Sequence, residues 1–175
     1  MLYSLSYILR ILRVTNAVLE RIAFVIAMAI VATIVFALFL SAVTRFISGN
    51  GYDWLIELPP VLLCWLVFPL LGPLLRKGQH IKVDVLGLYM SKKMKSLAKL
   101  INNFIALAAS SIFLKAGYDA TLLYYKMGQI LEIQLEIPVW WMYLAFPTGF
   151  LILMLFSLEL ILSDLDQFFK LRTED

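Results

Sequence analysis

The chain of 175 residues has few of the side chains from which enzymatic and metal sites are built. It contains a single cysteine, Cys64, and a single histidine, His80. One cysteine allows neither a disulfide within the chain nor a cysteine metal cluster. One histidine excludes a haem held between two histidines of this chain. The sequence therefore argues against disulfide, cysteine-cluster and bis-histidine haem chemistry for this chain alone.

Charge is also scarce, because charged residues make up 15% of the chain and hydrophobic residues 62%. A soluble domain has roughly 45–50% apolar residues. The mean hydropathy of +0.89 predicts an integral membrane protein. The net charge of +3 does not indicate a nucleic-acid partner, because the positive residues gather at the ends of apolar runs.

Four apolar runs are long enough to cross a membrane as helices, at residues 22–43, 55–75, 97–114 and 137–162. The first has no charged residue, and at about 1.5 Å per residue it covers a hydrocarbon core of about 30 Å. It is longer than a signal-peptide core of about 7–15 residues, so we expect a retained helix. The sequence predicts an all-α membrane protein with one membrane domain, residues 1–175.

Two amphipathic segments accompany these spans. Residues 1–19 place apolar side chains on one face and Arg10 and Arg13 largely elsewhere, which predicts a helix lying in the membrane interface. A second amphipathic segment runs from the end of the second span to about Lys95. We expect the third span to continue as a helix beyond Leu114.

The lysines and arginines predict the orientation of the spans. Cations are frequent before the first span, between the second and third spans and in the tail, and the opposite side carries Arg45, Lys115 and Lys126. Because cytoplasmic loops carry an excess of Lys and Arg, we expect both termini in the cytoplasm.

The centres of the predicted spans lack ionisable groups. The charged residues within the spans, Glu57, Lys99 and Glu159, lie near span ends, where a long side chain can reach the interface. Ion-coupled transporters usually carry ionisable residues near the bilayer centre. The sequence therefore indicates an accessory to a transporter rather than a transporter by itself.

Prolines and asparagines mark places where helices bend or meet. We expect a kink near Pro69 in the second span. Pro147 and Gly149, near the middle of the fourth span, fit either a broken-helix substrate site or a proline kink filled by a neighbouring helix, and we favour the kink. For Asn102 and Asn103 we favour inter-helix hydrogen bonds over ligand contact.

The stretch Gly72–Asp84 holds the only histidine of the chain, two adjacent basic residues and an acid eight residues after Arg76. If it is helical, Arg76, His80 and Asp84 lie at i, i+4 and i+8 and form an ion-pair chain on one face, although Gly78 interrupts the pattern. No nucleophile or second base accompanies them, and one His with one Asp is a weak metal site. The residues alone favour membrane anchoring with a local salt bridge.

Residues 54–86 resemble the small membrane subunit, of the DctQ type, of the tripartite ATP-independent periplasmic (TRAP) transporters. That family has an acid early in the second span, a tryptophan, a Leu-Gly element and an Arg-x-Gly-x-His-Ile-x-Val-Asp signature. The matching residues here are Glu57, Trp65, Leu71, Gly72, Arg76, Gly78, His80, Ile81, Val83 and Asp84. Residues 135–155 resemble the family's fourth span through Ile137, Pro138, Trp140, Tyr143, Pro147 and Gly149. One departure is Pro73, where small residues are usual.

This resemblance implies a small subunit in the bacterial inner membrane that is not an enzyme. It implies a large multi-span partner that holds the sodium and substrate sites, so that this chain needs no cofactor. A periplasmic binding protein would deliver an organic acid, such as a dicarboxylate or a sialic acid. The small subunit would enlarge the static scaffold of an elevator-type transporter. The chain ends at Asp175, so we expect the separate rather than the fused form.

The resemblance also implies roles for particular residues. The motif of Arg76, Gly78, His80 and Asp84 would brace a helix along the cytoplasmic interface. The expected packing positions against the large subunit are Glu57, Trp65, Gly72, Pro147 and Gly149. The expected docking positions for the binding protein are Arg45 and Asp53.

Two alternatives stay open at this point. One is a self-sufficient small homodimeric transporter that uses Glu57 as its membrane carboxylate. The other is a membrane enzyme or the anchor subunit of a redox complex, which a bound chromophore would reveal. The expected partners of the favoured function are the two other transporter subunits and membrane lipids, with no nucleic acid.

Overall fold

A computed structural model of the chain describes residues 2–77, 92–132 and 134–173, which are almost entirely helical. The elements are α1 (Leu2–Ser48), α2 (Trp54–Val67), the 3₁₀ helix η1 (Phe68–Leu70), α3 (Leu71–Arg76), α4 (Lys92–Met127), α5 (Val139–Tyr143) and α6 (Ala145–Thr173). Four helical stretches are long and apolar enough to cross a membrane: Tyr7–Ser48, Trp54–Arg76, Leu97–Met127 and Val139–Leu165. The prediction of four spans is confirmed.

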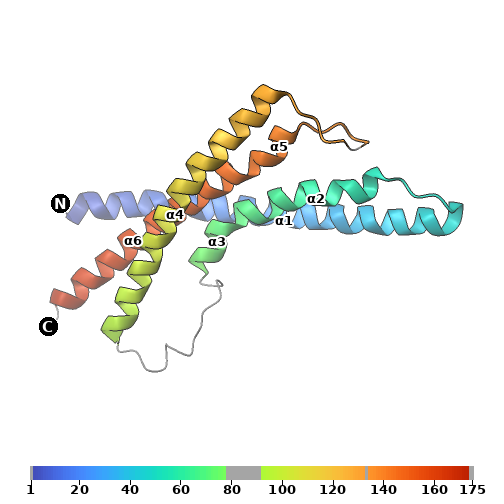
Figure 1. Cartoon of the computed structure of the whole chain (residues 1–175). Coiled ribbons are helices and arrows are strands. Elements are labelled where there is room, and N and C mark those ends of the chain that lie inside the picture. Colours follow the sequence, from blue (N-terminus) through green and yellow to red (C-terminus); the bar gives the residue numbers. More distant parts are fainter. Residues whose placement is uncertain (1, 78–91, 133, 174–175) are drawn as a thin grey trace.

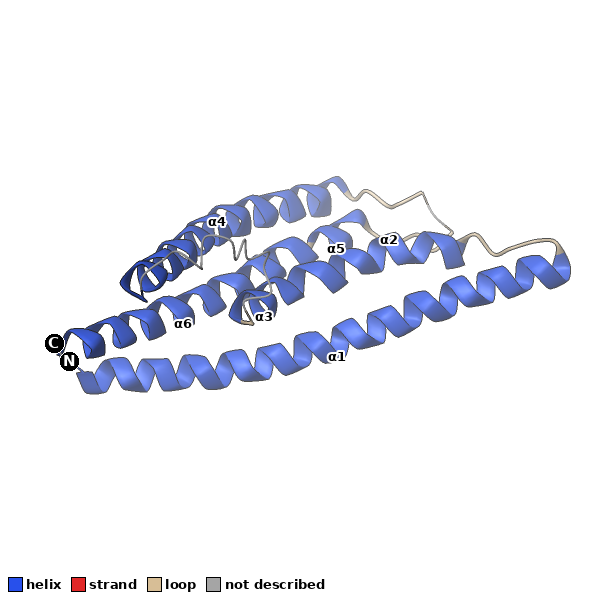
Figure 2. Ribbon diagram, turned by 90° about the horizontal axis from the view of Figure 1, so that it is seen from below, coloured by secondary structure: helices blue, strands red, loops and turns tan. Residues whose placement is uncertain are grey.

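The helices form two hairpins that meet in the middle of the molecule (Figure 1). α1 pairs with α2, and α4 pairs with α6, while η1 and α3 pack against α6 and join the two hairpins. Both termini lie at one end, and the turns that follow α1 and α4 lie at the other (Figure 2). This arrangement matches four membrane passes in alternating directions.

α1 is one uninterrupted helix of 47 residues. The sequence predicts a separate interfacial helix at residues 1–19, but the structure has no break between this segment and the first span. The segment from Leu2 to Ser48 contains no glycine and no proline, so nothing in the backbone ends the helix near Glu20. At about 1.5 Å per residue the helix is about 70 Å long. The position of residues 1–19 relative to a membrane surface stays a prediction.

The second span is bent at the proline where the sequence predicts a kink. α2 ends at Val67, Pro69 lies in the 3₁₀ turn, and α3 begins at Leu71. Proline has no amide hydrogen and its ring crowds the preceding turn, so an α-helix is interrupted there. The prediction of a kink near Pro69 is confirmed.

The two longest helices end at glycines in the left-handed region. Gly49 follows α1 with φ of 70°, and Gly128 follows α4 with φ of 62°. Only glycine adopts this conformation without a penalty from Cβ, which is why it so often follows the last helical residue. The third span therefore continues as a helix to Met127, and the prediction that it extends beyond Leu114 is confirmed.

Two other glycines lie at close contacts between the hairpins. A Cβ on Gly149 would lie 2.5 Å from backbone atoms of Phe68, and a Cβ on Gly72 would lie 2.8 Å from the Phe156 ring. Small residues at such crossings let helix backbones come together in a membrane. The crossing of α6 over η1 therefore requires a residue without a side chain at position 149.

We predict that Gly149→Ala destabilises the protein, because the added methyl group meets backbone that cannot rotate away. Overpacking of this kind costs about 1–3 kcal/mol. Thermal unfolding in mild detergent, followed by circular dichroism, measures the effect. Gly51→Ala is the matched control, since its new Cβ meets only the flexible Arg45 side chain. Equal unfolding temperatures for the two variants would contradict the prediction.

Candidate functional site where α1, α3 and α6 meet

Arg76, the last residue of α3, is held between carboxylates from two other helices. Its Nη1 atom lies 3.4 Å from Oε2 of Glu20 in α1, and its Nη2 atom lies 3.5 Å from Oε1 of Glu159 in α6. The neighbouring Lys77 places its Nζ atom 3.3 Å from Oε1 of Glu20. Lys77 Nζ also lies 4.0 Å from the centre of the Phe24 ring, a cation–π contact. We call Glu20, Arg76, Lys77 and Glu159 the charge cluster.

Glu159 is the most deeply buried member of the charge cluster. Its side chain is 6% exposed, whereas those of Glu20 and Arg76 are 21% and 30% exposed. A buried carboxylate is tolerated when opposite charge and hydrogen-bond donors surround it. Arg76 supplies the charge, and Asn16 of α1 donates from Nδ2 to Glu159 Oε2 at 2.7 Å.

Asn16 is itself fully buried and fastens α1 to α6. Its Nδ2 atom also donates to the backbone carbonyl of Leu155 at 3.2 Å. Its Oδ1 atom finds no hydrogen-bond donor among the described residues. The two donated bonds place the polar amide of α1 against the face of α6 that carries Glu159.

Two further polar contacts involve the C-terminal half of α6. Asn103 of α4 donates from Nδ2 to Asp164 Oδ2 at 2.8 Å, and Arg13 of α1 donates to Ser163 Oγ at 3.4 Å. The sequence-based preference for an inter-helix hydrogen bond is confirmed for Asn103, whereas Asn102 is exposed. Polar side chains from α1, α3 and α4 thus all contact α6 between Glu159 and Asp164.

Of the predicted cytoplasmic motif, Arg76 lies in the described part of the chain. Gly78, His80 and Asp84 lie outside the described residues, so the ion-pair chain from Arg76 to Asp84 stays a prediction. The sequence analysis missed Asn16, Glu20 and Glu159 as partners of this region. A signal was present, because Glu20, Arg76 and Glu159 all stand where a predicted span ends on the same side.

Glu57 and Trp65 connect α2 to the segment around α5. The Oε2 atom of Glu57 accepts a hydrogen bond from the backbone amide of Gln134 at 3.1 Å. The indole nitrogen of Trp65 donates to the carbonyl oxygen of Trp141 at 3.2 Å, and the two rings lie 5.5 Å apart. Both side chains therefore have partners within the chain.

Gly72, Pro147 and Gly149 are buried inside the chain. Gly72 and Gly149 lie at the crossings with α6 and η1, and Gly117 of α4 faces Pro147, where an added Cβ would lie 3.2 Å from the proline. The helical break lies at Leu144, between α5 and α6, one turn before Pro147. Packing of α4 against the proline agrees with the kink that the sequence analysis favours. Contact of these residues, or of Glu57 and Trp65, with a large subunit stays a prediction.

The predicted docking residues lie at the opposite end of the molecule from the charge cluster. Arg45 belongs to the last turn of α1, and Asp53 directly precedes α2. Both are exposed, and the Arg45 guanidinium lies beside Gly51 in the intervening turn. A role in docking a binding protein stays a prediction for both residues.

The described part of the chain contains no candidate metal-binding site. Within residues 2–77, 92–132 and 134–173, no group of three or more His, Cys, Asp or Glu side chains could hold a metal ion. The described polar network consists of ion pairs and hydrogen bonds between helices, and these contacts hold the helices together.

Four membrane-length helices joined by these polar contacts define the class of small multi-pass membrane proteins. The family model for the DctQ component of the tripartite ATP-independent periplasmic transporters matches residues 34–167, well over half of the chain. The chain belongs to this family, whose members are inner-membrane subunits that work with a large membrane subunit and a periplasmic binding protein. No curated protein matches the chain significantly.

We predict that Arg76→Met is strongly destabilising, because it leaves the buried Glu159 carboxylate without its cation. Removing one partner of a buried ion pair costs about 3–5 kcal/mol, and the partial exposure of Arg76 places the effect near the lower value. Thermal unfolding in detergent provides the measurement.

Lys77→Met is the matched control, since this more exposed pair contributes about 0–1 kcal/mol. The double variant Arg76→Met, Glu159→Gln is expected to lose less stability than the sum of the two single variants. Strict additivity would show that the two residues do not interact.

Proposed function

We propose that this chain is a static scaffold subunit of a sodium-coupled secondary transporter that imports an organic acid, such as a dicarboxylate or a sialic acid. Its membership of the DctQ family supports the assignment to a tripartite transporter. Substrate and sodium would bind to the large subunit, so that this chain carries no cofactor and performs no enzymatic reaction. The periplasmic binding protein would hand over the solute.

The observation that supports the scaffold role is that the charged residues of the charge cluster are paired with one another. Its two cations and two anions pair with one another across α1, α3 and α6. A residue that carries a solute or an ion through a membrane has to be free to bind it. The cluster instead ties three helices together, as a rigid support for a moving partner requires.

The exposed apolar surface supports a large partner in the membrane. In the most apolar stretch of α4, 11% of the residues are buried within the chain, and the corresponding share in α1 is 22%. Large hydrophobic side chains stand outward along both helices, among them Val25, Phe36, Phe104 and Ile112. We propose that the large subunit covers part of this surface and that lipid covers the rest.

The proposed orientation places both termini in the cytoplasm, following the excess of Lys and Arg at that end. The turns at residues 49–53 and 128–138 then face the periplasm, with Arg45 and Asp53 available to the binding protein. Charges at the rim of an interface mainly set the association rate and its salt dependence. Reversing both charges should therefore slow docking more than it changes dissociation.

We predict that the tagged full chain, purified from its native membrane in mild detergent, brings a large multi-span protein with it in a fixed ratio. Mass spectrometry identifies this protein. In liposomes under a sodium gradient, uptake is expected with the large subunit and a loaded binding protein present, and no uptake with this chain alone. Solute uptake by a homodimer of this chain alone would overturn the proposal.

We further predict that Glu57→Gln leaves uptake by the reconstituted complex within about twofold of the unchanged protein. The Glu57 carboxylate holds the backbone of Gln134, and a glutamine side-chain oxygen still accepts that hydrogen bond. Glu57→Leu, which removes the acceptor, is the control for the structural role. Loss of uptake in Glu57→Gln with normal assembly would instead favour a transport carboxylate in this chain.

A further inference from the structure

One face of α1 carries three openings that join end to end. The first is lined by α1 residues from Arg13 to Arg21, and the third by residues from Phe24 to Phe39 with part of the second span. The second is lined by residues from Ala17 to Val25, with the Glu20 carboxylate among them and Arg76 opposite. The first two share Ala17 and Arg21, and the last two share Phe24. We call this row of adjoining surface hollows the α1 track.

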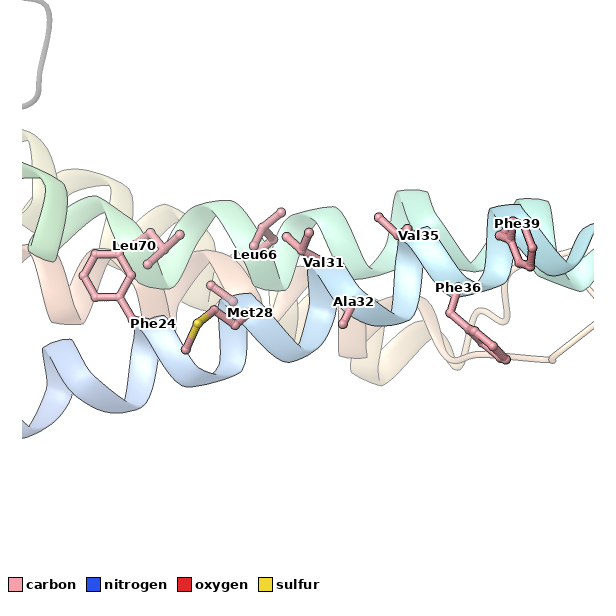
Figure 3. A pocket seen from close by; sticks show the side chains of 10 residues that line it. Phe24, Met28, Val31, Ala32, Val35, Phe36, Phe39, Leu66 and Leu70 are labelled. Carbon is pink, nitrogen blue, oxygen red and sulfur yellow. The ribbon is translucent and has the colours of Figure 1, made fainter.

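The longer part of the α1 track is an apolar groove between α1 and the second span. Its volume is about 740 Å³, and Leu66 and Leu70 form the wall opposite α1. Figure 3 shows these two leucines beside Phe24, Met28 and Val31, with Phe36 and Phe39 farther along the helix. Every lining residue is apolar. At about 1.5 Å per residue the groove is about 22 Å long, more than the half-thickness of a hydrocarbon core of about 30 Å.

The other end of the α1 track carries a surplus of positive charge. The charge cluster is balanced, because Glu20 and Glu159 offset Arg76 and Lys77. Arg13 and Arg21 have no carboxylate within ion-pair distance among the described residues. Arg13 donates to the neutral Ser163 hydroxyl, and the Arg21 side chain is exposed. Two guanidinium groups thus remain to bind an anion at the head of an apolar groove.

We propose that the α1 track binds an anionic phospholipid. The phosphate group would lie at Arg13 and Arg21, and one acyl chain would follow the groove past Phe24 and Leu70. A guanidinium group binds phosphate oxygens through two parallel hydrogen bonds, which favours arginine at this position. An anionic phospholipid matches this site because its negatively charged headgroup is followed directly by a hydrocarbon chain. Lipid binding at this site does not depend on the proposed transport function. The proposed orientation decides one point, that the bound lipid belongs to the cytoplasmic leaflet of the membrane.

Native mass spectrometry of the full chain in detergent tests the site, with phosphatidylglycerol and phosphatidylcholine of identical acyl chains as probes. We expect one phosphatidylglycerol to be retained in preference to phosphatidylcholine. Each basic residue near an anionic lipid contributes about fivefold in affinity, so Arg13→Gln with Arg21→Gln should weaken retention about 25-fold. Equal retention of the two lipids would overturn the proposal.

Two controls separate a site from general attraction to a positive surface. Arg10→Gln and Arg45→Gln each remove one positive charge outside the lining of the α1 track and should leave retention unchanged. If Arg10→Gln weakens retention as much as Arg21→Gln, the attraction is general and the site is refuted. Inorganic phosphate alone is expected not to protect the chain from unfolding, and protection equal to that of the lipid would overturn the role of the groove.

A second variant keeps the test decisive if the double arginine variant fails to fold. Ala32 is exposed and lines the groove, so Ala32→Trp fills the path of the acyl chain without changing any charge. This variant should also lose phosphatidylglycerol. The same measurement on the complex with its large subunit should retain the lipid. If the complex excludes the lipid and position 32 cross-links to a helix of the large subunit, the lipid proposal is overturned. The proposed transport function would not be affected by that result.

Discussion

The burial of one carboxylate, that of Glu159, is the constraint on which the packing of this bundle depends. A charge removed from both water and lipid headgroups needs a counter-charge and hydrogen-bond donors. Arg76 arrives from α3 and Asn16 from α1, so three helices have to converge at one level of α6. The kink at Pro69 and the side-chain-free crossing at Gly149 are the backbone features that bring α3 into this position.

The distribution of polar groups separates the two ends of the molecule from its middle. One end holds the charge cluster, and the other holds the turns with Arg45 and Asp53 and the contact between Glu57 and Gln134. Between them, the helices meet through many apolar, aromatic and small residues, such as Phe68, which packs against Phe146 in a tilted arrangement with ring centres 4.0 Å apart. A subunit built this way holds its shape in hydrocarbon without offering a polar path across it.

The features that depend on the residues of a single segment could be predicted from the sequence. Long apolar runs gave the four spans, Pro69 gave the bend, and the absence of charge in span centres indicated an accessory role. The unbroken α1 was missed because a change from amphipathic to apolar composition suggests a boundary, whereas no glycine or proline interrupts the backbone between Leu2 and Ser48. The partners of Arg76 were missed because the pattern of one segment points to its near neighbours, His80 and Asp84. Glu20 and Glu159 become its neighbours only once the helices are packed.

The closure of the charge cluster has a consequence for the order in which the protein is made. The hydrogen bonds of Asn16 reach Leu155 and Glu159, which lie 139 and 143 residues farther along the chain. During synthesis α1 enters the membrane first and α6 last, so the amide of Asn16 has no partner until the fourth span is made. Glu20 can pair with Arg76 and Lys77 earlier, once the second span is in place. The bundle can lock only after the fourth span has been inserted. A chain that ended before Leu155 would leave the Asn16 amide without either of its hydrogen-bond partners in α6. Such an incomplete chain would expose a polar group that the complete bundle buries.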